Sequence, residues 1–127
     1  MLTNSKPVIL IPTIKKQEAR EFYEKVLGLT FKVDDGFAIV FDTGGIMLRL
    51  TTVHEFTPHP FSVLGWEVDD ISKSVEALVN RGVTFERYDF PWMEQDELGI
   101  WAAPDGTKVA WFKDPDGNLL SVAQHAK

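Results

Sequence analysis

Cysteine is absent from this chain of 127 residues, which excludes disulfide bonds, cysteine-based zinc sites and thiol nucleophiles. Long apolar segments are also absent near the start, where the run at residues 8–11 is far too short for a signal sequence or a membrane span. Basic clusters do not extend beyond Lys15 and Lys16, and the formal net charge is −6. These features predict a cytoplasmic protein with no nucleic-acid partner and no membrane partner.

Aromatic residues, by contrast, are plentiful. The chain has four Trp and nine Phe, and its 44% hydrophobic and 25% charged residues are typical of a globular domain. Some of these rings must fill the core, but aromatic side chains also line pockets for small molecules. The composition therefore favours one folded domain with a small-molecule ligand.

The first half of the chain has the pattern of a strand, a helix and three more strands. Residues 8–11 are apolar and three of the four are β-branched, which predicts a buried strand. Residues 13–28 predict a helix that ends at a glycine, because apolar residues recur at helical spacing before Gly28. The apolar face of this helix comprises Ala19, Phe22, Tyr23, Val26 and Leu27, and the three strands are expected near residues 29–33, 37–41 and 46–51.

The second half repeats this order. Residues 61–68 predict a strand, and Asp69 and Asp70 open a helix that ends at Gly82, with Ile71, Val75, Leu78 and Val79 on its apolar face. An insertion at residues 89–105 follows. Strands are expected at residues 108–113 and 118–124, and the turn between them is Asp114-Pro115-Asp116-Gly117.

A sequence repeat relates the two halves. Gly28 and Gly82 are 54 positions apart, as are Phe31 and Phe85. The repeat predicts a single α+β domain made of a duplicated half-domain. Its expected parts are module one at residues 1–52, a proline-containing linker at 53–60 and module two at 61–127.

Three segments resemble the vicinal oxygen chelate superfamily: residues 21–29, residues 66–71 and residues 112–118. This superfamily includes glyoxalase I, extradiol dioxygenases, fosfomycin-resistance enzymes and bleomycin-binding proteins. The resemblance implies two βαβββ modules whose strands form a curled mixed sheet around a U-shaped cleft. It also implies a homodimer in which two chains pair.

The same resemblance identifies four cleft positions that hold His or Glu in the metalloenzymes of the superfamily. Here these positions are Val8, Arg49, Val63 and Ser121, none of which is a usual metal ligand. We therefore expect no metal and no other cofactor. The leading function is metal-independent binding of a small organic molecule, anionic or aromatic, in the cleft. The alternatives are a glyoxalase-like lyase or isomerase with a non-standard or absent metal site, and an assembly module whose cleft is filled by side chains.

Arg49 stands between Leu48 and Leu50 on an expected strand, so alternation sends its guanidinium to the face opposite the leucines. On that face it would bind an anionic ligand, extend to solvent or pair with Glu67, which is expected to face the cleft too. Glu67 is also the candidate base if the protein is a metal-free enzyme.

The other candidate ligand-binding residues are aromatic or small. Trp92 and Trp101 lie in the insertion, which either covers the cleft, packs onto the sheet or forms a dimer contact. Trp111 and Ser121 are expected on cleft-facing positions of the last two strands, whereas Trp66 is expected in the core. For His54, Glu55 and His59 in the linker, solvated loop side chains are favoured over a metal site, and His125 near the end is expected to be exposed.

Overall fold

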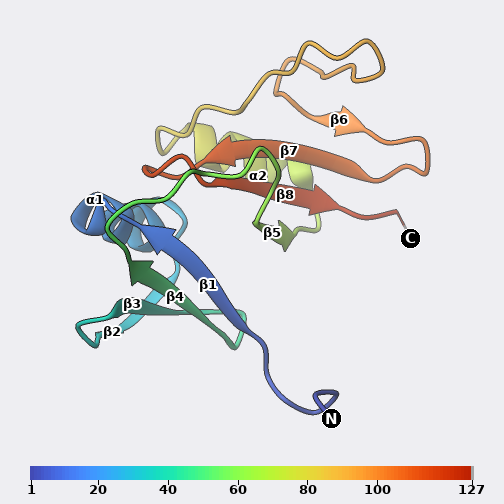
Figure 1. Cartoon of the computed structure of the whole chain (residues 1–127). Coiled ribbons are helices and arrows are strands. Elements are labelled where there is room, and N and C mark those ends of the chain that lie inside the picture. The colour runs from blue at the N-terminus through green and yellow to red at the C-terminus, as the bar shows by residue number, and fades with distance from the viewer. Residues whose placement is uncertain (127) are drawn as a thin grey trace. The chain divides into compact units, whose positions relative to one another are not determined.

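A computed structural model of the chain describes residues 1–126. The contacts between residues divide it into two compact units, Met1–Thr57 and the part from Pro58 onward. Figure 1 shows a four-stranded sheet in each unit. Among the described residues, no helix is both long and apolar enough to cross a membrane.

The first unit has the predicted order of elements. Its sheet has the order β1-β4-β3-β2, in which β1 runs parallel to β4 and the other pairs are antiparallel. The hairpin turns contain glycines at positive φ, a backbone conformation that glycine adopts without steric cost. The elements are β1 (Val8–Thr13), α1 (Lys16–Glu21), η1 (Phe22–Val26), β2 (Thr30–Asp34), β3 (Ala38–Thr43) and β4 (Ile46–Thr52).

The helical segment of the first unit differs from the predicted single helix over residues 13–28. It begins at Lys16, and its second half is a π-helical turn in which the Leu27 N–H donates to the Phe22 carbonyl at 2.9 Å. Wider turns of this kind are uncommon, and hydrophobic periodicity does not distinguish them from α-helix. Ala19 is buried as expected, and the segment ends at Gly28 with φ of 75°.

The second unit has the sheet order β5-β8-β7-β6, with β5 parallel to β8. Strand β7 has the predicted bounds, whereas β5 is shorter than the predicted strand at residues 61–68. Asp70 caps α2 by accepting the Lys73 N–H at 3.2 Å. Val79 was expected on the buried face of α2 but is exposed. The elements are β5 (Leu64–Glu67), α2 (Ile71–Val79), β6 (Trp101–Ala102), β7 (Lys108–Lys113) and β8 (Leu119–Gln124).

The second unit does not reproduce every strand of the first. Phe85, the counterpart of Phe31, forms only an isolated bridge with Phe112, whereas Phe31 lies in a full strand. The long segment between α2 and β6 takes the place of a regular second strand, and Figure 1 shows it running past β7. The two modules nevertheless confirm the predicted glyoxalase-like α+β architecture.

Each sheet has one face that contacts its own helix and one face that does not. Buried leucines define the helix-side face, with Leu48 and Leu50 on β4 and Leu120 on β8. We call the opposite side of the second sheet its open face. Alternation and register assign to this face Gly65 and Glu67 on β5, Ser121 and Ala123 on β8, Val109 and Trp111 on β7, and Trp101 on β6.

Candidate ligand-binding site

Arg49 lies on the face of the first sheet opposite Leu48 and Leu50, as predicted. Its guanidinium donates to the Asp35 carboxylate at 2.8 Å, and the Arg49 side chain is 27% exposed. Asp35 lies in the turn between β2 and β3, where its other oxygen accepts the N–H groups of Phe37 and Ala38. These hydrogen bonds, the one from Phe37 first, lower the pKa of Asp35 to about 2. Arg49 therefore has an anionic partner within its own unit.

Five aromatic side chains form a closed ring of contacts on the second unit. Tyr88 stacks on Phe90, and Phe90 stacks on Trp92, with centroid separations of 5.7 and 5.5 Å. Trp92 then meets Trp101 edge-on at 5.8 Å. Trp111 completes the ring, at 6.1 Å from Trp101 and 5.6 Å from Tyr88. We call these five residues the aromatic cluster.

The aromatic cluster is only partly shielded from solvent. Trp92 is 65% exposed and Phe90 is 48% exposed, whereas the other three rings are half-buried. Burial raises the pKa of the Tyr88 phenol, with a smaller contribution from the charge of Glu86. These five adjoining rings form a group of aromatic side chains that is partly exposed on the second unit.

The insertion that carries Trp92 is held by polar contacts with the preceding segment. The Gln95 side chain accepts the Tyr88 N–H at 2.8 Å and donates to the carbonyls of Glu86 and Gly99. Arg87 donates to two carbonyls of the acidic stretch, at residues 96 and 97. These hydrogen bonds tie the insertion to residues 86–88 of the preceding segment.

A pocket of about 510 Å³ borders the aromatic cluster. It lies within the volume range typical of sites for small organic molecules. Its charged side chains are two carboxylates and one ammonium. The lining residues are Ser72, Trp92, Glu94, Gln95, Asp96, Ile100, Trp101, Ala102 and Lys108.

Ser121 occupies the middle of the open face. Its Oγ lies 2.9 Å from the Oγ of Ser62, which itself donates to the Leu64 carbonyl at 3.2 Å. Each hydroxyl has one hydrogen, so Ser121 must be the donor to Ser62, and its lone pairs point to an acceptor role toward a ligand. Gly65 lies beside it in the register, and a Cβ at Gly65 would approach the Ser121 Oγ to 2.7 Å.

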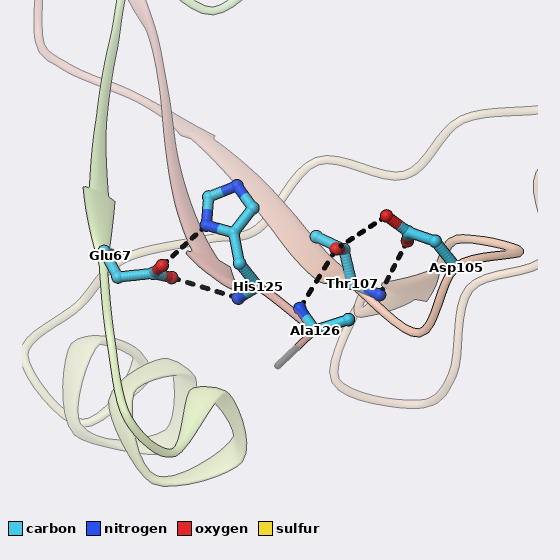
Figure 2. Close-up of polar contacts among 5 residues, drawn as sticks. All are labelled: Glu67, Asp105, Thr107, His125 and Ala126. Atoms are coloured by element: carbon cyan, nitrogen blue, oxygen red, sulfur yellow. Dashed lines mark hydrogen bonds and ion pairs between the residues drawn. The ribbon is translucent and has the colours of Figure 1, made fainter.

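Glu67 is bound by His125 at both carboxylate oxygens (Figure 2). The His125 backbone N–H donates to Oε2 at 3.0 Å, and the imidazole Nδ1 lies 2.7 Å from Oε1. These hydrogen bonds, the backbone one first, lower the pKa of Glu67. The sequence suggested Arg49 and Glu67 as partners of each other, but Arg49 pairs with Asp35 and Glu67 is hydrogen-bonded by His125, each within its own unit.

The four positions that hold metal ligands in related metalloenzymes do not fit a divalent ion. Val8 and Val63 offer no donor atom, and Arg49 places a cation beside Asp35. Ser121 is a hydroxyl that already donates to Ser62. Within residues 1–126, no three side chains of His, Cys, Asp or Glu are arranged to hold a metal ion.

The glyoxalase/bleomycin resistance protein/dioxygenase superfamily model matches residues 8–122. The chain belongs to this superfamily. Solved structures agree on the fold. A glyoxalase family protein from Bacillus anthracis has a TM-score of 0.73 at 17% identity, over 97% of this chain and 96% of that one. The lactoylglutathione lyase of Agrobacterium tumefaciens has a TM-score of 0.70 at 18% identity, over 96% and 95%.

A third similar structure comes from mobile DNA. A protein from the mobile metagenome of V. Pseudocholerae has a TM-score of 0.65 at 26% identity, over 100% of this chain and 98% of that one. A comparison with curated proteins finds no match. Membership of the superfamily is therefore secure, and it leaves the chemistry of this member to be argued from its own residues.

The structure brings some of the predicted site residues together and shows further residues that the sequence analysis missed. Trp92, Trp101 and Trp111 meet in one cluster, but Tyr88 and Phe90 were missed. Alternation at residues 88, 90 and 92 was the available signal, because three rings at period two share one side of an extended chain. The partnership of His125 with Glu67 was also missed. Trp66, expected in the core, is on the helix-side face but only half-buried.

Proposed function

We propose that this protein binds a planar organic molecule on the aromatic cluster of the second unit and that it does so without a metal ion. The observation that carries the proposal is the closed ring of five aromatic contacts beside a pocket of about 510 Å³. Exposed Trp rings offer a planar ligand both apolar contact and stacking. The misfit of Val8, Arg49, Val63 and Ser121 to a metal supports a metal-independent mode.

The charge of the second unit favours neutral or cationic ligands. Residues 58–127 contain 6 Lys and Arg against 12 Asp and Glu, whereas residues 1–57 contain 7 of each. The whole formal charge of −6 thus belongs to the unit that carries the aromatic cluster. A cation over a Trp face is further stabilised by the ring quadrupole. Arg49 was the basis for expecting an anionic ligand, and its pairing with Asp35 weakens that expectation.

A thermal-shift screen of planar compounds tests the proposal. The panel contains matched cationic, neutral and anionic members, each measured in EDTA and again with added divalent metals. A ligand at about a hundred times its dissociation constant should stabilise the fold by about 2.7 kcal/mol. We expect such stabilisation from cationic or neutral compounds in EDTA, with no further gain from metals.

Substitutions in the aromatic cluster, with a control in the first unit, test where the ligand binds. Trp92→Ala removes the most exposed ring of the aromatic cluster and should weaken binding. Phe37→Ala is the matched control, because Phe37 is an even more exposed ring but belongs to the first unit. Binding that requires a metal, or that survives Trp92→Ala and Trp101→Leu unchanged, would contradict the proposal.

A glyoxalase-like lyase or isomerase remains the second candidate, because the open face carries one carboxylate–imidazole pair, Glu67 and His125. The homodimer and the cytoplasmic location are proposals too. They rest on the superfamily and on the composition of the chain.

A further inference from the structure

We propose that Glu67 and His125 form a general-base dyad that removes a proton from a planar molecule held by the aromatic cluster. This inference depends on the binding function proposed above only for the position of the substrate. The dyad itself rests on the contacts of its two residues.

The hydrogen bonds to Glu67 fix the tautomer of His125. An ionised carboxylate can only accept hydrogen bonds, and the pKa of Glu67 is lowered, so Glu67 is ionised at neutral pH. The atom 2.7 Å from its Oε1, Nδ1 of His125, must therefore carry the hydrogen. In the neutral imidazole the lone pair is then on Nε2. This is the atom that can accept a proton from a substrate.

The position of the imidazole is also fixed. The His125 backbone N–H binds the second oxygen of Glu67, so the residue is tied to β5 through two atoms. The next residue, Ala126, donates its N–H to the Thr107 hydroxyl at 3.2 Å, and that hydroxyl donates to Asp105 at 3.2 Å. Figure 2 shows these hydrogen bonds, with Glu67 bound to His125 on one side and Thr107 bound to Ala126 on the other. The carboxylates of Glu67 and Asp105 both interact electrostatically with His125.

The imidazole is open to a substrate. The side chains of Glu67 and His125 are 58% and 62% exposed. No hydrogen bond to the Nε2 atom of His125 is present in the described part of the chain. An exposed, oriented imidazole with its lone pair on Nε2 can act as a general base toward a substrate proton that comes within hydrogen-bond reach.

The register places this base on the same face as the aromatic cluster. Glu67, Ala123, Val109 and Trp101 form one row across the four strands. Neighbouring strands are about 4.8 Å apart, so the backbones of Glu67 and Trp101 are separated by about 14 Å. The short side chains of Ala123 and Val109 lie between them. A planar molecule over these two residues can touch a Trp ring on one side and the imidazole on the other.

The proposed step is balanced without a co-reactant. The Nε2 lone pair takes a proton from an acidic C–H of the substrate, and the C–H bonding electrons move into the substrate. The resulting imidazolium is stabilised by Glu67 and later returns its proton to the product or to water. The substrate class is a planar aromatic or heteroaromatic molecule with an activated C–H bond. Glu67 acts as a positioning residue.

The probe 5-nitrobenzisoxazole tests this step. It is planar, and removal of its one ring C–H next to nitrogen breaks the N–O bond and releases a coloured phenolate. We expect the wild-type protein to accelerate this elimination. His125→Gln should reduce the rate by about tenfold or more. His54→Gln and His59→Gln are matched controls and should leave it unchanged.

A second measurement does not depend on activity. In ¹⁵N spectra at alkaline pH, His125 should show the Nδ1–H tautomer in the wild type and should lose this preference in Glu67→Gln. A wild-type rate equal to that of His125→Gln, or an Nε2–H tautomer in the wild type, would overturn the dyad. Elimination that depends on His125 but is unchanged in Trp101→Leu would instead overturn the aromatic position of the substrate and leave the base intact.

Discussion

Arg49 and Asp35, 14 positions apart, form an ion pair at 2.8 Å that joins the middle of β4 to the turn between β2 and β3. Asp35 also accepts the backbone N–H groups of Phe37 and Ala38 at 2.9 Å each. One carboxylate therefore closes the hairpin turn and neutralises the guanidinium on the adjacent strand. Arg49 was expected to bind an anionic ligand, but its positive charge is already neutralised by Asp35 of the same unit.

The lowered pKa of Asp35 predicts a loss of stability in acid. The pKa is about 2, against an ordinary value of 3.8. A carboxyl group whose pKa is lower in the folded state stabilises the fold fully above its ordinary pKa, and this contribution is lost as pH falls toward 2. The difference in unfolding free energy between wild type and Asp35→Asn should therefore shrink between about pH 4 and pH 2.

Urea unfolding at several pH values measures this difference. Asp89→Asn, which alters an exposed aspartate of the second unit, is the control and should show a difference that varies less with pH. An Asp35→Asn difference that stays constant down to pH 2 would show that the Asp35 contacts do not stabilise the fold.

The pairing of Arg49 illustrates what sequence patterns can and cannot predict here. Strand alternation correctly predicted that Arg49 lies opposite Leu48 and Leu50, because period-two alternation is a local property of the backbone. The partner depends on a turn side chain that folds back over the strand. Asp35 lies in a turn, and its hydrogen bond to Arg49 joins residues 14 positions apart, which no local pattern indicates.

The same distinction applies to the rest of the fold and site. Glycines and the sequence repeat were sufficient to predict both modules, since helix ends and hairpin turns are set by local chemistry. The π-helical turn at Phe22–Val26 and the partnership of Glu67 with His125 were not predictable. The first leaves no signal in hydrophobic periodicity, and the second joins residues 58 positions apart.

The metal content of the purified protein tests whether it can carry out the metal-dependent chemistry of the superfamily. We expect purified protein to contain no stoichiometric Ni, Zn, Fe or Mn, because Val8, Arg49, Val63 and Ser121 do not supply the required donors. Elemental analysis after dialysis against EDTA is the measurement. About one metal ion per chain would refute this prediction and would reopen metal-dependent glyoxalase or dioxygenase chemistry.

Assembly can be tested in solution. The superfamily commonly pairs two chains, so light scattering should give a mass close to twice the 14.4 kDa of one chain. For such a dimer the melting temperature should rise with protein concentration, because association stabilises the folded state by mass action. A monomer mass at high micromolar concentration, with a melting temperature independent of concentration, would exclude the dimer.

Gly65 and Ser121 provide a test of side-chain coupling on the open face. A Cβ at Gly65 would lie 2.7 Å from the Ser121 Oγ, which is closer than real contacts of this type. In Gly65→Ala the hydroxyl must therefore rotate, and its hydrogen bond to Ser62 is lost. One such bond is worth about 1 kcal/mol. The alanine also stabilises the strand backbone by about 0.5–1 kcal/mol, so the single substitution alone should have a small net effect.

The double-mutant cycle separates these two contributions. In the Ser121→Ala background the clash and the hydrogen bond are both absent, so Gly65→Ala should stabilise the protein there. The two measurements of Gly65→Ala should differ by about 1 kcal/mol in unfolding free energy, which is the coupling between the sites. Urea denaturation of the four proteins gives this value. Equal effects of Gly65→Ala in both backgrounds would mean that Ser121 does not hold the hydroxyl orientation described here, and its acceptor role toward a ligand would lose its basis.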